Sequence, residues 1–153
     1  MSILVIFDVN SDTAVLSSTT ESVAETVAVE LGEGTSAVPV AGLGPDSLTG
    51  VKLLVVGSPV AGWRSPPRLQ AFLAQLRPGT LRGVRAAAFD TRARRSLHGN
   101  SAGRMSRALE KAGAHVVAPP TGFKVDKRAG ALAPGEDTRV AAWAGLIASA
   151  LRR

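Results

Sequence analysis

The stretch VKLLVVGSPVAGWRSPPRLQAFLAQL, residues 51–76, contains the pattern that decides the fold. It begins with residues 51–56, which are apolar except for Lys52 and are typical of a strand buried on both faces of a sheet. Gly-Ser-Pro ends that run, and residues 66–76 then place leucine and phenylalanine at helical spacing, with proline at the first position. The stretch therefore predicts a strand, a loop and a helix in succession.

The same alternation continues on both sides of this stretch. The expected strands are residues 3–7, 36–40, 51–56, 84–89 and 115–118, the last of which can resume at 122–125. The expected helices are residues 20–31, 66–76, 101–112 and 137–151, with one helical turn at 45–48. This order predicts an α/β fold, a doubly wound five-stranded parallel sheet with helices on both faces. No linker or repeat divides the chain, so residues 1–153 are expected to form a single domain.

The composition argues against several kinds of site. The chain has 153 residues and no cysteine, which excludes disulfides, cysteine nucleophiles and iron–sulfur clusters. Two histidines are too few for a metal site of several histidine ligands. No apolar run reaches the roughly 18 residues of a membrane span, and the first ten residues lack the basic segment of a signal peptide. We therefore expect a protein without a metal site or a membrane segment, located in the cytoplasm.

The expected sheet also predicts where function lies. In doubly wound sheets, ligands bind beyond the carboxyl ends of the strands, at the point where the strand order reverses. The segments after the first, third and fourth expected strands are residues 8–20, 57–65 and 90–100. We therefore expect the functional residues in these three segments.

Motifs in these segments resemble those of the flavodoxin-like family. GSPVAGWRSP at residues 57–66 resembles the family's third-strand loop, and FDTR at residues 89–92 resembles the end of its fourth strand. Further similar motifs follow in the same order: Ser101-Ala102, GFKV at 122–125, GAL at 130–132 and GE at 135–136. The resemblance covers most of the chain. It implies the flavodoxin-like strand order 2-1-3-4-5, bound FMN and electron transfer.

The resemblance implies that the FMN phosphate binds at the N-terminus of the first helix, where backbone N–H groups and the helix dipole favour an anion. The hydroxyl side chains expected there are Ser17, Ser18, Thr19, Thr20 and Ser22. The segment departs from the family because residues 1–31 contain no glycine, the residue that eases tight turns and close backbone approach. Two alternatives stay open. The hydroxyls only cap the helix, or residues 10–13 form the phosphate site.

The resemblance also places the flavin ring between the segments after the third and fourth strands. The residues expected around the ring are Ser58, Pro59, Val60, Ala61 and Trp63 from one segment and Asp90, Thr91 and Arg92 from the other. Trp63 is expected to stack against the ring; alternatively it covers an apolar patch or anchors a homodimer. Arg92 is the cation expected nearest the ligand. The second segment has no aromatic residue except His98, although family members often place one there.

Two functions follow from this resemblance. The first is an electron carrier that binds FMN and exchanges electrons with a redox partner, rather than an enzyme that converts a substrate. The alternative is a flavodoxin-like domain that has lost FMN and serves as a binding or regulatory module, which the glycine-free first loop favours. Nucleic-acid binding is not expected, because aromatic residues make up only 4% of the chain and no known reading motif is present.

The charged residues are divided unevenly along the chain. Residues 1–50 hold seven acidic residues and no Lys or Arg, whereas residues 51–153 hold all 18 basic residues and five acidic ones. In a single sheet these two parts are neighbours, so the basic residues should gather around the segments after the third and fourth strands. This polarity suggests an acidic redox partner, or an anionic ligand held by Arg64 and Arg92.

Overall fold

The structure, a computed structural model, describes residues 2–9, 14–32, 34–60, 67–93, 100–126 and 128–152. Its strands are β1 (Ser2–Phe7), β2 (Thr35–Pro39), β3 (Val51–Pro59), β4 (Arg85–Ala93), β5 (His115–Val116), β6 (Thr121–Asp126) and β7 (Ala131–Leu132). They form one sheet in the order β2-β1-β3-β4-β6-β7, and β5 also pairs with β4. Every pairing is parallel except that of β6 with β7. The predicted α/β class and parallel sheet are therefore confirmed.

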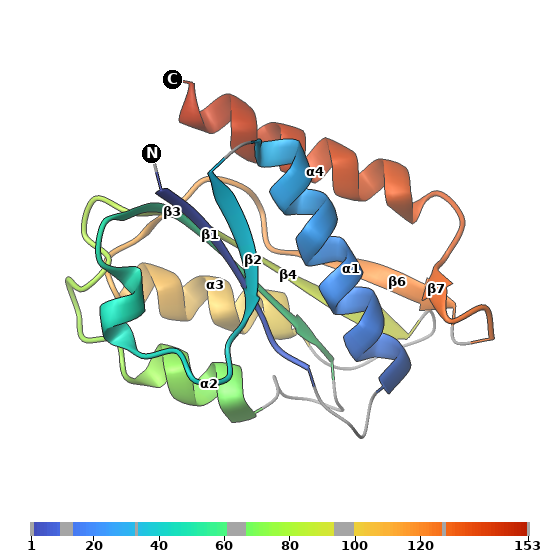
Figure 1. Cartoon of the computed structure of the whole chain (residues 1–153), viewed down its shortest axis with the longest axis horizontal. Coiled ribbons are helices and arrows are strands. Elements are labelled where there is room, and N and C mark those ends of the chain that lie inside the picture. The colour runs from blue at the N-terminus through green and yellow to red at the C-terminus, as the bar shows by residue number, and fades with distance from the viewer. Residues whose placement is uncertain are drawn as a thin grey trace.

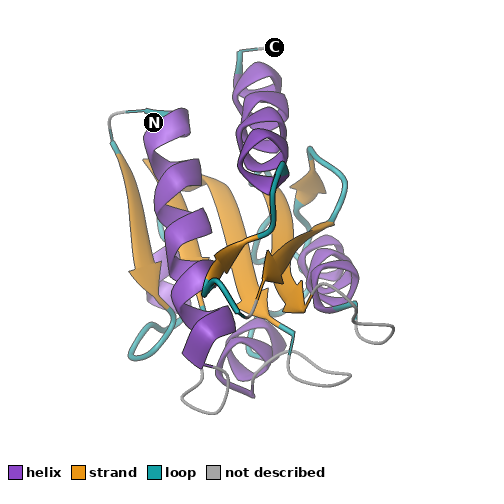
Figure 2. Cartoon of the chain, turned by 90° about the vertical axis from the view of Figure 1, so that its right-hand side faces the viewer, coloured by secondary structure: helices purple, strands orange, loops and turns teal. Residues whose placement is uncertain are grey.

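Helices cover both faces of this sheet, as Figures 1 and 2 show. The helical elements are α1 (Ala14–Leu31), the 3₁₀ turn η2 (Pro45–Leu48), α2 (Pro67–Ala74), α3 (Ser101–Lys111) and α4 (Glu136–Leu151). One apolar core joins α2, α3 and η2 to the sheet, and a second joins α1 and α4 to the opposite face. No helix in the described part of the chain is long and apolar enough to cross a membrane.

The fifth position of the sheet differs from the simple expectation. Two short strands, β5 and β6, occupy it one after the other, and both pair in parallel with β4. Pro119 and Pro120 lie between them, and proline cannot donate a ladder hydrogen bond, so the strand is interrupted there. The antiparallel edge strand β7 was not predicted. It has only two residues, and so short a run carries no periodicity.

Several elements extend toward the end of the sheet where function is expected. Strands β3 and β4 continue to Pro59 and Ala93, so the first residues of the predicted loops are strand residues. Helix α1 begins at Ala14 rather than at the predicted Thr20, because Ala, Val and Leu at 14–16 are compatible with a helix. The hydroxyl residues from Ser17 onward therefore lie within α1, not at its start.

The core on the α1–α4 side includes three packed aromatic rings. The Phe89 and Phe123 rings each meet Trp143 edge-on, with ring centroids 5.8 Å and 5.9 Å away. The Trp143 indole N–H donates to the Pro119 carbonyl over 2.9 Å, which satisfies its polar group inside the core. Trp143 is thus a core residue, as its place on the apolar stripe of the last helix indicated.

Candidate functional site

The strand order reverses between β1 and β3. Strand β1 lies between β2 and β3, and the helix after β1 covers one face while the helix after β3 covers the other. We call the edge at which the parallel strands β1, β3 and β4 end the carboxyl edge. A crevice at such a reversal is where doubly wound sheets bind ligands.

Three buried polar residues form a row across the carboxyl edge. The Asp8 N–H donates to the Gly57 carbonyl, which places Asp8 beside Ser58, and Ser58 pairs with Asp90 in the strand register. All three are at most 1% exposed and lie on the α2–α3 side of the sheet, by the alternation of side chains along each strand. The row lies at the end of that core where the strands finish, and it carries two carboxyl groups.

Asp8 binds the N-terminus of α2. Its Oδ2 accepts a hydrogen bond of 2.9 Å from the Leu69 N–H in the first turn of that helix. Its Oδ1 is buried without a partner among the described residues. Burial raises the pKa of Asp8, although the hydrogen bonds from Leu69 and Val9 and the charge of Arg68 act to lower it.

Asp90 binds Arg92 and the N-terminus of α3 at once. The Arg92 Nε and Nη2 donate to the two carboxylate oxygens over 2.8 Å and 2.6 Å, a bidentate pair. The Ala102 N–H donates to Oδ2 over 2.9 Å. This pairing raises the pKa of Arg92. The guanidinium crosses Gly122 of the next strand, where a methyl group would lie 2.3 Å from Nε.

The hydroxyl residues of α1 point in different directions. Thr20 and Thr91 are buried, and their hydroxyl oxygens lie 2.5 Å apart, which links α1 to the end of β4. Ser17 and Thr19 are also buried, whereas Ser18 and Ser22, one helical turn apart, are exposed. The structure therefore does not bring these five hydroxyl groups together on one face of the helix.

The ends of β3 and β4 are joined. The Val60 N–H donates to the Thr91 carbonyl over 2.8 Å, and Pro59 pairs with Thr91 in the register. Ser58, Pro59, Val60, Asp90, Thr91 and Arg92 thus form one connected group at the carboxyl edge. The other residues singled out in the sequence lie outside the described residues, namely Ala61, Trp63, Arg64, His98 and residues 10–13.

Two residues of this edge were absent from the predicted set. They are Asp8 and Ser101. The Ser101 hydroxyl, at the first position of α3, is buried without a partner among the described residues. A carboxylate directly after an apolar strand was the available signal for Asp8, whereas nothing in the sequence marked Ser101 as buried. The described residues contain no cluster of three or more His, Asp or Glu side chains that could hold a metal ion.

Comparison with known proteins rests on structure. No family model matches the chain, and no curated protein matches it in sequence. Solved flavodoxins match it over nearly their whole length, each with a TM-score of 0.76. An archaeal flavodoxin is 14% identical and flavodoxin 2 of Bacillus cereus is 21% identical, and each match covers 100% of both chains. A flavodoxin of Streptococcus pneumoniae TIGR4 is 17% identical, with 98% of this chain and 99% of that chain covered.

The strand order and its reversal between β1 and β3 define a doubly wound α/β protein. Among proteins of this class, the chain has the flavodoxin-like fold, and it is similar to flavodoxins along its whole length.

Proposed function

We propose that the protein binds FMN at the carboxyl edge and transfers electrons to or from a protein partner. The observation that carries the proposal is the reversal of strand order between β1 and β3, with the start of α1 and the joined ends of β3 and β4 around it. Bound FMN would supply one- and two-electron redox chemistry. The proposal includes a cytoplasmic location, which suits a chain without cysteine.

The helix N-termini support a phosphate site at α1. Asp8 and Asp90 place carboxylates on the N-termini of α2 and α3. The first turn of α1 holds no acidic residue. An anion is favoured where free N–H groups and the positive end of the dipole meet no competing carboxylate. We therefore propose the phosphate site at the first turn of α1; Asp12, in the segment directly before the helix, is an acidic residue that such a site would have to keep away from the phosphate.

The remaining residues would hold the rest of the cofactor. Pro59, Val60 and Thr91 fix the ends of β3 and β4, so the segments that follow them start from a rigid base. Trp63 is proposed to stack on the flavin ring. Asp90 and Arg92 bind each other and position α3, so we assign them a supporting role. Asp8 Oδ1 and Ser101 Oγ have no partner among the described residues, so they leave buried hydrogen-bonding capacity at this edge, which fits a polar ligand.

A flavin measurement tests the proposal. The purified protein should show the absorbance bands of bound flavin, or should quench the fluorescence of added FMN at micromolar concentration. Riboflavin, which lacks the phosphate, should bind more weakly if α1 holds that group. A colourless protein that leaves FMN fluorescence unchanged would contradict the proposal.

One observation favours the second candidate, a domain of this fold that acts as a binding module without FMN. Residues 1–31 contain no glycine, and the buried Thr20 hydroxyl contacts Thr91 within the protein. The same FMN titration separates the two functions, since only the first requires binding.

The redox partner in this proposal is acidic. The described segments 67–84 and 101–111 carry six basic residues and one acidic residue, Glu110. An acidic partner would be drawn to that side of the molecule, and its association should slow as ionic strength rises.

A further inference from the structure

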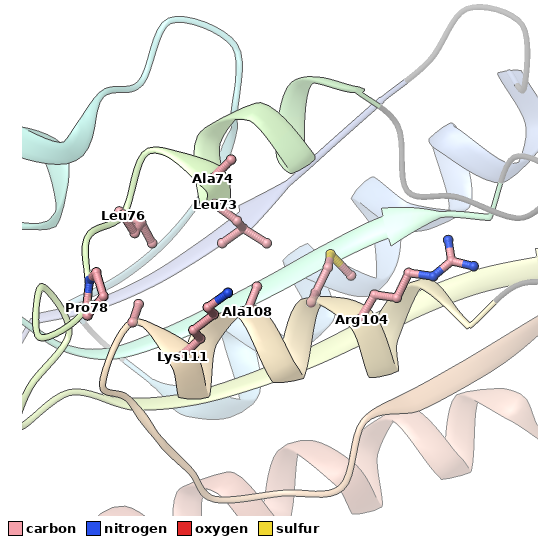
Figure 3. Close-up of a pocket in the computed structure, with 9 residues that line it drawn as sticks. Leu73, Ala74, Leu76, Pro78, Arg104, Ala108 and Lys111 are labelled. Atoms are coloured by element: carbon pink, nitrogen blue, oxygen red, sulfur yellow. The ribbon is translucent and has the colours of Figure 1, made fainter.

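A groove lies between α2 and α3 (Figure 3). Its volume is about 400 Å³, within the range of roughly 300–1,000 Å³ that is typical of small-molecule sites. Apolar side chains form most of its lining, chiefly Leu73, Leu76, Pro78, Met105, Ala108 and Ala112. Leu73, Met105 and Ala112 are buried members of the α2–α3 core, so the floor of the groove is the core itself.

The groove exists because the two helices face each other with short elements and small side chains. Helix α2 ends at Ala74 after eight residues, and the chain then turns away at Gly79, which has a φ of 90°. Across from it lie Ala108 of α3 and Ala112, the residue directly after that helix, whose methyl groups do not fill the gap. The apolar hollow is therefore built by the backbone and by residue size.

Two cations flank this hollow on α3. Arg104 and Lys111 are seven residues apart, two helical turns or about 10.5 Å along the axis, and both line the groove. Figure 3 shows them at opposite ends of that side. The two salt bridges among the described residues, Arg92 with Asp90 and Arg139 with Glu136, involve neither of them. Both charges are thus available to a ligand.

The depression on the other side of α3 offers a contrast. It is larger, about 570 Å³, but both Arg107 and Glu110 line it. Its charges balance, so it selects neither an anion nor a cation. The α2–α3 groove has cations and no acidic residue in its lining.

We propose that the groove between α2 and α3 binds an amphiphilic anion, a small molecule with a carboxylate or sulfonate head and an apolar body. The apolar body lies on Leu73, Met105 and Ala108, and the head pairs with Lys111 or Arg104. None of Asp8, Ser58 and Asp90 lines this groove, and the proposal does not rest on FMN binding.

The test uses decanoate as the probe, with decylammonium as a matched cation, each titrated into the full chain by calorimetry. Decanoate should bind with a Kd below roughly 1 mM, and decylammonium should bind at least about tenfold more weakly. Equal binding of the two probes, or no binding of decanoate at this limit, would overturn the proposal.

Variants locate the site. Lys111→Gln and Arg104→Gln should each weaken decanoate binding about two- to fivefold, because each removes one charge at the protein surface. Arg107→Gln is the control, since it removes the same charge from the opposite side of α3 and should leave the affinity within about twofold. An equal loss in all three variants would show general attraction to a basic surface and contradict the proposal.

Ala108→Trp fills the groove and should abolish decanoate binding, while circular dichroism checks that the chain is folded. Ala108→Leu is a smaller change that should weaken binding about tenfold or more if Ala108→Trp fails to fold. Unchanged decanoate affinity in a folded Ala108 variant would place the probe elsewhere and overturn the proposal.

Discussion

Asp90 binds a guanidinium and a helix N-terminus while fully buried. Its side chain is 0% exposed, and the Arg92 side chain is 24% exposed. Such a pair is not strongly stabilising as a whole, but removing one partner leaves the other charge uncompensated. Arg92 is therefore a structural partner of Asp90, and its guanidinium is directed to that carboxylate.

Asp90→Asn should lower the free energy of unfolding by about 2–4 kcal/mol, because Arg92 loses its counter-charge in a mostly buried position. Urea unfolding measures the change. Asp137→Asn is the matched control: Asp137 is an exposed acidic residue in the first turn of α4, and its loss should change stability by less than about 1 kcal/mol. Equal effects of the two substitutions would contradict the structural role of Asp90.

Asp8 should make stability depend on pH. Because burial raises its pKa in the folded state above the ordinary value of 3.8, the folded chain holds this proton at pH values where the unfolded chain has released it. Stability from this group is fully present below 3.8 and is lost as the pH rises through the folded-state pKa. Asp8 ionised at neutral pH therefore destabilises the fold.

Asp8→Asn mimics the protonated acid and retains an acceptor for the Leu69 N–H. The stability of this variant relative to the original chain should increase as the pH rises from about 4 to about 8. Urea titrations across that range measure the difference. A difference that stays constant with pH would show that Asp8 does not titrate with a raised pKa.

At the scale of elements, the pairing of β3 with β4 depends on a glycine beside an aromatic ring. Gly57 and Phe89 are partners in the register, and a methyl group at residue 57 would lie 2.0 Å from Phe89 Cζ. The ring is itself held against Phe123 and Trp143. Neither the strand nor the ring has room to move aside.

Gly57→Ala should therefore destabilise the protein by about 1–3 kcal/mol through overpacking. Gly44→Ala is the control, since no atom lies within 4 Å of the added methyl and the φ of −128° suits alanine. Its effect should stay within about 0.5 kcal/mol. Thermal unfolding of both variants makes the comparison, and a neutral Gly57→Ala would mean that the β3–β4 packing is looser than described.

At the scale of the whole molecule, charge is divided between the two helical layers. Helix α1 has three acidic residues and no basic residue, whereas α3 has three basic residues and one acidic residue. The uneven charge along the sequence thus becomes an acidic face and a basic face of one sheet. Both parts of the chain contribute strands to that sheet.

Cofactor binding should also appear in the stability of the whole chain. If FMN binds only the folded state, FMN at 100 times its Kd raises the free energy of unfolding by about 2.7 kcal/mol.

Trp63→Ala should weaken FMN affinity by about 1 kcal/mol if the indole stacks on the ring. Urea unfolding with and without FMN measures both. Equal stabilisation of the variant and the original chain at limiting FMN would show that Trp63 does not stack on the flavin.

The sequence by itself determined the class of fold. Continuous apolar runs at residues 3–7 and 53–56 could be buried only in a sheet covered on both faces, and local periodicity is visible without any tertiary contact. The predicted bounds of β1, α3 and α4 agree with the observed bounds within a few residues. The predicted start of α1 was wrong, because the same apolar stripe is compatible with a helix that begins at Ala14 or at Thr20.

Only the tertiary structure decided the roles of the polar residues. Asp8 and Leu69, or Thr20 and Thr91, are far apart in the chain, and no local pattern shows that they meet. Whether Arg92 pairs with Asp90 or remains available to a ligand depends on how the ends of strands and helices come together. The groove between α2 and α3 likewise arises from the spacing of two helices, which periodicity does not specify.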